Sequence, residues 1–416
     1  MKEVKRVPKL RFPDFLEEWK EKKYRNIYSF YSTNSFSRDN LNYESGAIKN
    51  IHYGDIHTKF STLFDIEKEI VPFVNDDIKI SNIKDENYLN EGDLLIADAS
   101  EDYNDIGKTI EVVNLNNEKV ISGLHTFHAR PNKFKMALGF SGFMLQNKNV
   151  RLQVKKIAQG TKVLGLATSR LGEINLNIPS FSEQQKIATF LASVDKKIDQ
   201  LQQKKHLLEQ YKKGVMQQVF SQQLRFKDDN GNDYPDWEEK KLGELVLFQN
   251  GKAHEQDISH DGEYIVVNSK FISTDGQVKK FSNELICPLA KNDIVMVMSD
   301  VPNGKAIAKC YFIDRDNAYT LNQRICSLRT KGTNPTYLFY ILNRNRYYLK
   351  FDSGVSQTNL RKDEVLDCPL NIPESLNEQA KIANFLSGID KKIALVTTQI
   401  ENTQQFKKGL LQQLFV

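Results

Sequence analysis

The sequence lacks several features that would assign a chemistry by themselves. Its four cysteines, Cys287, Cys310, Cys326 and Cys368, show no CxxC spacing, so neither a disulfide framework nor a zinc site is indicated and a reducing cytoplasm is expected. No apolar run reaches the roughly 18 residues of a membrane span. The first ten residues are charged, with no apolar segment after them, so we expect a soluble chain that is not exported.

Motifs for catalysis and cofactor binding are incomplete. Gly107-Lys108-Thr109 resembles the end of a phosphate-binding loop, but Asp102 stands where its first glycine is required. Asn334-Pro335-Thr336-Tyr337 is one residue away from the Asn-Pro-Pro-Tyr pocket of adenine methyltransferases, and no glycine-rich loop for a methyl donor accompanies it. His52 and His57 have no obvious third ligand for a metal. We therefore predict no catalytic residue, no metal site and no cofactor on this chain.

The overall composition decides little about partners. The 416 residues allow two or three folded domains, and 40% hydrophobic residues is ordinary for a folded protein. The 58 basic residues against 53 acidic ones leave a net charge of +5, which is compatible with nucleic acid but does not indicate it.

The most informative feature is an internal duplication. Residues 183–220 and 378–415 align without a gap at an offset of 195 residues (378 − 183), and share Glu-Gln-x-Lys-Ile-Ala, Phe-Leu, Asp-Lys-Lys-Ile and Lys-Lys-Gly. Apolar residues recur in steps of three and four over about five heptads, which predicts one long helix per copy, the two packed antiparallel. The residues expected to mediate helix pairing or partner docking are Ile187, Leu191, Val194, Ile198, Leu201, Ile382, Leu386, Ile389, Ile393 and Val396.

A glycine occupies the same place near the end of both predicted helices. Gly214 and Gly409 each cost about 1 kcal/mol of helix stability relative to alanine. Close approach of another backbone, a bend, or tolerance at a frayed helix end would each explain them.

Each long helix is preceded by a segment of different character. Short apolar runs separated by Gly, Asn, Asp and Pro predict two α+β modules, with strands expected at residues 51–56, 92–97, 109–113, 150–154, 264–267, 293–297 and 307–312 and a helix at 335–346. Each module opens with a Leu-Arg-Phe motif and a tryptophan, Trp19 or Trp237, that we expect to anchor its core. The predicted segments are a first module at 1–180, a first helix at 181–222, a second module at 223–375 and a second helix at 376–416.

The two modules resemble each other only at isolated landmarks. Gly107-Lys108 aligns with Gly304-Lys305, and Leu124-His125 aligns with Leu321-Asn322, while the residues between landmarks differ almost freely. This pattern predicts one scaffold used twice with two different surfaces.

The doubled helix motif, after Asn-Ile-Pro in both copies, resembles the specificity subunit of type I DNA restriction-modification systems, and the likeness covers essentially the whole chain. The resemblance implies a non-enzymatic DNA-binding subunit with two target recognition domains held apart by two antiparallel helices. Each domain would bind one half of a bipartite double-stranded DNA target. Two methyltransferase subunits would dock on the helices, nuclease/translocase subunits would join them, and S-adenosylmethionine, ATP and Mg would be bound by these partners.

Basic and amide side chains in the modules are the candidate DNA contacts, because such groups meet phosphates and base edges. The candidates are Arg38, Lys108, His125, Lys162, Arg170, Lys252, Lys270, Lys305, Asn322, Gln323, Arg324, Gln357 and Arg361. Among them Lys108 and Lys305 are preferred as phosphate contacts, since the glycine before each would admit close approach. The alternative function is a coiled-coil scaffold that does not recognise a DNA sequence.

Overall fold

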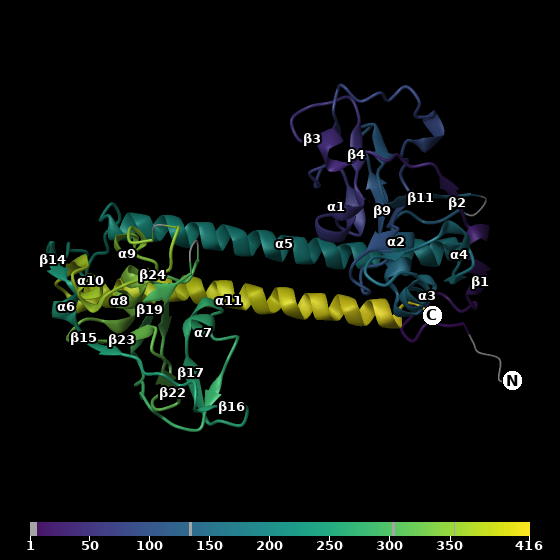
Figure 1. Cartoon of the computed structure of the whole chain (residues 1–416). Helices are drawn as coiled ribbons and strands as arrows, with labels where there is room; N and C mark the ends of the chain where they lie inside the picture. The colour runs from purple at the N-terminus through teal and green to yellow at the C-terminus, as the bar shows by residue number, and fades with distance from the viewer. Residues whose placement is uncertain (1–5, 133–134, 302–303, 353) are drawn as a thin grey trace. The chain divides into compact units, whose positions relative to one another are not determined.

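The computed structural model describes residues 6–132, 135–301, 304–352 and 354–416 (Figure 1). The chain forms two compact units: Met1–Gln203 with Thr397–Val416 is unit 1, and Lys204–Val396 is unit 2. Each unit holds one module of mixed strands and helices, together with part of α5 (Phe181–Phe220) and part of α11 (Leu376–Gln413). The predicted α+β class and the two long helices are confirmed.

The module of unit 1 is built on a five-stranded sheet in the order β2-β11-β7-β9-β5. Its strands are Tyr28–Tyr31, Thr126–Pro131, Leu94–Ala97, Thr109–Asn114 and Leu63–Asp65. A four-stranded sheet follows the order β10 (Val120–Ser122), β4 (Lys49–Ile51), β6 (Phe73–Val74), β3 (Leu41–Asn42). Two-stranded ladders join β1 (Lys20–Lys23) to β13 (Asn175–Ile178) and β8 (Ala99–Ser100) to β12 (Leu164–Gly165). The helices are α1 (Tyr53–Thr58), α2 (Phe140–Gln146), α3 (Lys148–Ile157) and α4 (Thr168–Leu171), with 3₁₀ turns at Tyr24–Asn26, Arg38–Asn40 and Asp85–Asn87.

The module of unit 2 repeats this plan with fewer strands. One sheet has the order β15 (Val246–Asn250), β23 (Ile325–Thr330), β19 (Ile294–Val297), β21 (Cys310–Phe312). The other has the order β16 (Ile258–Ser259), β18 (Phe281–Ser282), β17 (Tyr264–Val267), β22 (Tyr319–Leu321). The ladders are β14 (Trp237–Lys241) with β25 (Pro369–Pro373) and β20 (Ser299–Asp300) with β24 (Thr358–Asn359). The helices are α6 (Leu242–Leu245), α7 (Ser269–Ser273), α8 (Pro335–Leu342), α9 (Arg346–Leu349) and α10 (Lys362–Leu366).

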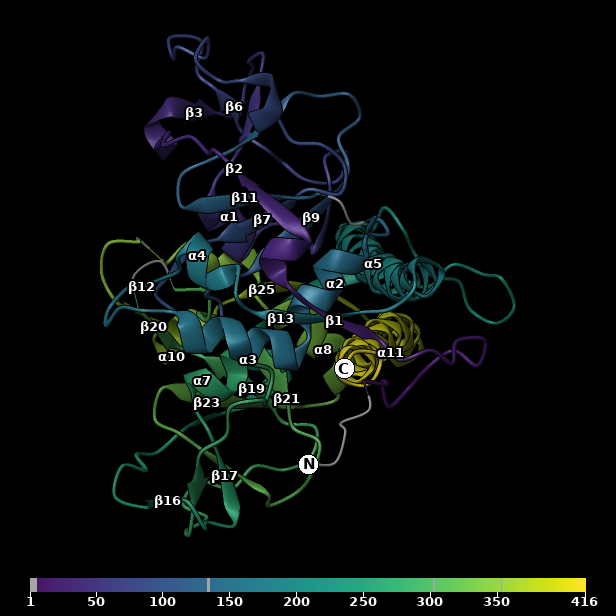
Figure 2. The ribbon, with the colours of Figure 1, turned by 90° about the vertical axis from the view of Figure 1, so that its right-hand side faces the viewer.

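The long helices pack antiparallel in both units, and Figures 1 and 2 show their ribbons side by side. In unit 1 Lys407 Nζ lies 2.6 Å from Asp195 Oδ1, and in unit 2 Lys212 Nζ lies 2.6 Å from Asp390 Oδ1. The aspartate of each Asp-Lys-Lys-Ile motif therefore binds the first lysine of the other helix's Lys-Lys-Gly motif. Apolar seam residues bury the rest of the contact, with Ile187, Leu191, Val194 and Ile198 clustered with Leu410 and Leu414, and Ile382, Leu386 and Ile389 clustered with Val215 and Val219.

The glutamate that opens each helix motif binds the module's first segment. Glu183, 1% exposed, accepts hydrogen bonds from Arg11 Nε and Nη2, both at 2.8 Å, and from Trp19 Nε1 at 3.2 Å. In unit 2 Arg225 Nη2 lies 3.2 Å from an oxygen of the equally buried Glu378. A buried carboxylate requires such a partner, so each Leu-Arg-Phe motif is fixed to the start of its helix.

The glutamine that follows bonds two backbone groups. Gln184 Oε1 accepts from Ala137 N at 3.0 Å, and Gln379 Oε1 accepts from Asn334 N at 2.8 Å. Their Nε2 atoms donate to a proline carbonyl just before each helix, at 3.1 and 2.8 Å. The repeated Glu-Gln pair is thus the joint between each module and its long helix.

The end of each long helix also meets an equivalent segment. Leu224 N donates to Gln218 O at 3.0 Å where the chain leaves α5. Leu10 N donates to Gln413 O at 2.9 Å although these residues lie near opposite ends of the chain. The N-terminal segment therefore contacts the end of α11 in unit 1 in the way that the segment at Leu224 contacts the end of α5.

One predicted strand at 51–56 is wrong, because β4 ends at Ile51 and α1 begins at Tyr53. The His52 Nδ1 atom accepts a hydrogen bond from Gly54 N at 3.1 Å and so caps the helix start. The apolar run at 51–56 is too short for the spacing of its residues to show where the strand ends and the helix begins.

The predicted strand at 150–154 is also wrong, since this segment lies in α3. Asn147 caps the helix by accepting from Asn149 N at 2.8 Å, and Val150 and Val154 are buried one turn apart. In unit 2 the expected strand at 307–312 is limited to Cys310–Phe312, and the expected helix at 335–346 ends at Leu342.

Both tryptophans pack as predicted. Trp19 is 3% exposed within the apolar cluster of unit 1, and Trp237 packs at the edge of the cluster of unit 2. Across the ranges that the structure covers, no helix is both long and apolar enough to cross a membrane.

Candidate nucleic-acid interface

Several of the predicted contacts lie at one structural feature of each module, which we call the strand corner. In unit 1 it is residues 123–125, between β10 and β11, and in unit 2 it is residues 322–324, between β22 and β23. At each corner the chain passes from the sheet that contains β10 or β22 into the sheet that contains β11 or β23, which we call the main sheet of the module.

Backbone hydrogen bonds show which corner residues correspond. Asp98 N donates to His125 O at 3.0 Å, and Met298 N donates to Arg324 O at 3.0 Å, each just after the equivalent central strand, β7 or β19. His125 is therefore the counterpart of Arg324. The predicted alignment of Leu124-His125 with Leu321-Asn322 was wrong by two residues, because the sequence did not reveal the strand register.

The predicted alignment of Gly107-Lys108 with Gly304-Lys305 is also wrong. Ala97 N donates to Lys108 O at 2.9 Å, and Val297 N donates to Lys309 O at 3.0 Å. Gly107 and Ala308, which precede these lysines, both have positive φ, 69° and 54°. Gly107-Lys108 thus corresponds to Ala308-Lys309 and not to Gly304-Lys305, and an alanine in a left-handed conformation concealed the match.

These equivalent lysines have the same internal role. Lys108 Nζ donates to His57 O in the last turn of α1 at 2.7 Å, and Lys309 Nζ donates to Ser273 O at the end of α7 at 3.0 Å. A lysine at a helix C-terminus satisfies a carbonyl that has no partner within the helix and interacts favourably with the helix dipole.

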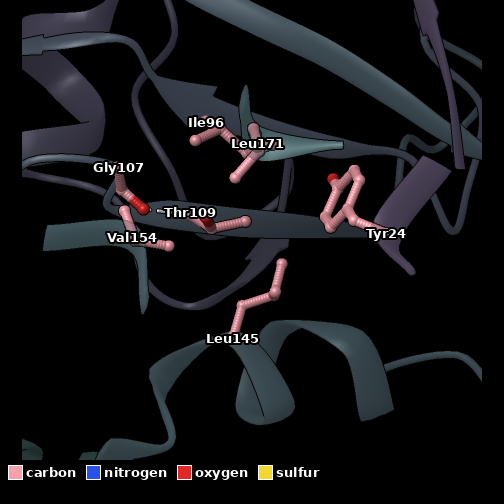
Figure 3. A pocket seen from close by; sticks show the side chains of 7 residues that line it. All are labelled: Tyr24, Ile96, Gly107, Thr109, Leu145, Val154 and Leu171. Atoms are coloured by element: carbon pink, nitrogen blue, oxygen red, sulfur yellow. Dashed lines mark hydrogen bonds between the residues drawn. The ribbon is translucent and has the colours of Figure 1, made fainter. Parts of the chain in front are cut away.

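Gly107 faces the interior of its module. A Cβ atom there would lie 2.6 Å from Val154 Cγ1, and the residue lines a cavity of about 10 Å³ with Tyr24, Ile96, Thr109, Leu145, Val154 and Leu171 (Figure 3). Two of these lining residues are joined by a hydrogen bond, in which Thr109 Oγ1 donates to Gly107 O at 3.1 Å (Figure 3). The cavity is about the size of one water molecule, too small for a ligand.

Gly304 is also explained by packing inside its module. A Cβ there would overlap the Asp300 carboxylate, whose Oδ2 accepts from Ala306 N at 2.6 Å and Ile307 N at 3.0 Å. The exposed Lys305 next to it has no ion pair to the described residues.

A two-stranded ribbon lies beside each corner: β8 with β12 in unit 1 and β20 with β24 in unit 2. The residue directly after β7 or β19 connects the corner to the ribbon. Besides its bond to the corner, Asp98 O accepts from Leu166 N at 2.8 Å just after β12, and Met298 O accepts from Leu360 N at 2.7 Å just after β24. Corner and ribbon therefore share one backbone arrangement in the two modules.

The side chains on this shared backbone differ. In unit 2 Ser299 Oγ donates to Asn359 Oδ1 at 2.6 Å, and Gln357 Nε2 donates to Ser299 Oγ at 2.7 Å. The register places Ala99 and Gly165 of unit 1 at the positions of Ser299 and Asn359. One ribbon thus carries hydroxyl and amide groups where the other carries none.

Besides Arg38, Lys108 and Lys305, the sequence-predicted contacts divide into two groups. Those on or beside a corner or ribbon are His125, Lys162, Lys252, Asn322, Gln323, Arg324 and Gln357. Arg170 holds the base of the first ribbon by donating to Ile157 O and Gln159 Oε1, Arg361 pairs with Glu364 at 3.0 Å, and Lys270 is exposed in α7. The sequence did not single out Asp98, Ser299 or Asn359, because each lies at the end of an apolar strand or in a short polar loop.

Two aspartates near the first corner have shifted pKa values. Burial raises the pKa of Asp98, and the nearby His125 opposes this rise from 3.2 Å. Burial alone would also raise the pKa of Asp55, but hydrogen bonds from Arg38 and Lys59 lower it below its usual value. Arg38, at 2.7 Å from Asp55, is therefore partly engaged inside the module.

The seam residues predicted for pairing or docking are mostly inaccessible. Ile187, Leu191, Val194, Ile198, Leu201, Ile382, Leu386, Ile389 and Val396 are buried, and Ile393 is partly buried. A partner on the long helices would meet other side chains.

Within the described ranges no group of three or more His, Cys, Asp or Glu could hold a metal ion.

The lysine equivalence predicts a stability effect. Replacing Lys108 by alanine should cost about 1 kcal/mol, because the end of α1 loses a charged hydrogen-bond donor. Lys309→Ala should cost a similar amount in unit 2, and the exposed Lys305→Ala serves as the control that leaves stability unchanged. Thermal unfolding of the three variants measures this, and equal melting temperatures for Lys108→Ala and Lys305→Ala would contradict the assigned role.

Comparison with known proteins gives the family. A family model described as "Type I restriction modification DNA specificity domain" matches residues 16–210 and 234–404. The MjaVIII specificity subunit of a type I restriction enzyme from Methanocaldococcus jannaschii is 25% identical over 285 residues, covering 63% of this chain and 66% of the relative. The StySPI specificity subunit from Salmonella potsdam is 22% identical over 312 residues, covering 68% of this chain and 65% of the relative. The matches thus span just under two thirds of the length of these two relatives.

A solved structure shares the fold. The S subunit of a type I restriction-modification system from M. genitalium superposes with a TM-score of 0.59 at 13% identity, covering 99% of both chains. The family model accounts for both modules and most of both long helices. This chain therefore belongs to the type I restriction modification DNA specificity domain family, and it carries the domain twice.

Proposed function

We propose that this chain is the DNA sequence-specificity subunit of a type I restriction-modification complex. Each module would bind one half of a bipartite, asymmetric target in double-stranded DNA, and the paired long helices would set the length of the unread spacer. The observation that supports this most directly is the corner and ribbon, where one backbone arrangement carries different side chains in the two modules. A scaffold protein that does not recognise DNA sequence would have no use for this difference.

In this proposal the chain itself is not an enzyme. Two methyltransferase subunits and the nuclease/translocase subunits would carry the chemistry and bind S-adenosylmethionine, ATP and Mg, and the complex would act on cytoplasmic DNA. Affinity would come largely from lysine and arginine on phosphates, and discrimination from groups on base edges.

Exchange of one module tests this function. Replacing residues 1–180 by the equivalent module of a relative, in a host that carries the whole system, should change one half of the methylated sequence and leave the other half intact. Sequencing that detects methylated bases across the genome measures this, with a strain lacking the chain as control. If the methylated sequence stays the same after the exchange, the chain is a scaffold and this function is wrong.

The long helices offer a second surface for a partner. Tyr211 in unit 2 is 53% exposed and Phe406 in unit 1 is 55% exposed, and the offset of 195 residues makes them equivalent. Gly214 and Gly409 follow three residues later on the same helix face, and a Cβ on either would have no described neighbour within 4 Å. Close approach of another part of this chain therefore does not explain these glycines.

We assign this pair of surfaces, Tyr211 with Gly214 and Phe406 with Gly409, to two copies of one partner, the methyltransferase subunit. An exposed aromatic ring supplies apolar contact area, and the neighbouring glycine lets a partner backbone approach closely. Because the two surfaces lie at equivalent places of the duplicated helices, they favour one kind of partner bound twice.

Truncating these rings should weaken assembly. Tyr211→Ala or Phe406→Ala should each weaken one of the two methyltransferase contacts by roughly tenfold or more, and the double variant should weaken both. Native mass spectrometry of the assembled complex measures the stoichiometry. Tyr103→Ala, which removes a ring that is 52% exposed in the module of unit 1, is the matched control. Two methyltransferase subunits retained at full affinity on the double variant would refute this docking surface.

A further inference from the structure

The equivalence of His125 and Arg324 allows a residue-level inference about recognition. Both residues immediately precede the strand that pairs with the centre of the main sheet, β11 or β23, and both accept the same backbone hydrogen bond there. Their Cα atoms therefore hold the same place in the frame of each module. If the two modules bind the same kind of ligand with the same surface, these two side chains lie at equivalent positions on that surface.

Arg324 is available for a ligand. Its side chain is exposed, and the described residues offer it no ion pair or side-chain hydrogen bond. Its neighbour Gln323 is engaged, since Gln323 Nε2 donates to Glu255 Oε1 at 2.8 Å. Ser299 and Asn359 lie in the ribbon, which begins at the residue after Met298, and Gln357 directly precedes its second strand. A free guanidinium beside a polar ribbon matches the donor fork that pairs with two acceptors of one base.

His125 is held in place more firmly. Its backbone has a φ of 54°, a conformation that residues other than glycine seldom adopt. Its Nδ1 lies 3.2 Å from Asp98 Oδ1, and its ring packs edge-on against Tyr53 with centroids 5.2 Å apart. The side chain is still 50% exposed, so the Nε2 edge of the ring can meet a ligand while Asp98 and Tyr53 fix its orientation.

We propose that His125 and Arg324 are base-reading residues at matching positions of the two half-targets, and that Arg324 reads a guanine through its O6 and N7 atoms. This inference rests on the proposed function. The two half-targets would differ at that position because one is read by the imidazole of His125 and the other by the guanidinium of Arg324. Asp98 is a positioning residue that acts through the His125 ring.

The test replaces Arg324 in the full-length chain, in a host that carries the whole restriction-modification system. Arg324→Gln should relax one guanine in one half of the methylated sequence, raising methylation at other bases there roughly tenfold, and should leave the other half unchanged. His125→Ala should relax one position in the other half only, and Asp98→Asn should do the same more weakly. Genome-wide detection of methylated bases gives both half-targets for each variant.

Arg315→Gln is the matched control. It removes the same charge from the same module, but Arg315 follows β21, whose Phe312 pairs with Ile294 at the far end of β19 from the corner. It should leave the methylated sequence unchanged. Arg324→Lys keeps the charge without the fork, so it should also relax the guanine, and it provides the test if Arg324→Gln fails to fold.

The outcomes separate the two levels of the argument. An unchanged guanine preference in Arg324→Gln overturns the reading role. A uniform loss of methylation at all sites by a folded and assembled Arg324→Gln protein makes Arg324 a phosphate contact and also overturns it. If the wild-type chain itself adds no methylated sequence to the genome, the proposed function fails instead.

Discussion

The structure depends on the antiparallel pairing of two long helices that come from distant parts of the chain. Each unit is closed by a segment of both helices, and each segment contributes an aspartate or a lysine to one of two equivalent ion pairs, Asp195 with Lys407 and Asp390 with Lys212. The Glu-Gln pair at the start of each helix then fixes the module, because its buried carboxylate requires the arginine of the module's first segment. Helix pairing and module attachment are therefore encoded in motifs that both copies of the repeat share.

Beyond these features, which the two halves of the chain share, the modules differ. The central strands, the lysine that caps α1 or α7, and the hydrogen bond at the strand corner are the same in both modules. The exposed side chains there, such as Arg324 on the corner and Gln357 and Asn359 at the ribbon, are not shared by the two modules. Because these side chains contribute little to the core, they can change without loss of the fold, which is the property that a sequence-reading surface needs.

Much of the architecture could be predicted from the sequence, and the limits have physical causes. The helices were predictable because a heptad pattern over about 38 residues is unambiguous and occurs twice. The helices α1 and α3 were not, because a short run such as 150–154 fits a strand or a helix equally well until its cap, Asn147, is seen in place. The alignment of the two modules was wrong at Gly107, because its structural counterpart is Ala308. Both residues have a positive φ, which the sequence suggests only for a glycine. Of the predicted contacts, the sequence found exposed polar residues near both corners, but the internal role of Lys108 depends on a carbonyl 51 residues earlier in the chain and left no local signal.

A double-mutant cycle between Asp195 and Lys407 tests the pairing of the helices most directly. These side chains are partly buried, 28% and 18% exposed, so reversing either charge alone should lower the free energy of unfolding. Reversing both, as Asp195→Lys with Lys407→Asp, should restore most of the loss and give a coupling of about 1 kcal/mol or more. Strictly additive losses would show that the two helices do not meet at this point, and the account of a chain closed by its own paired helices would be wrong.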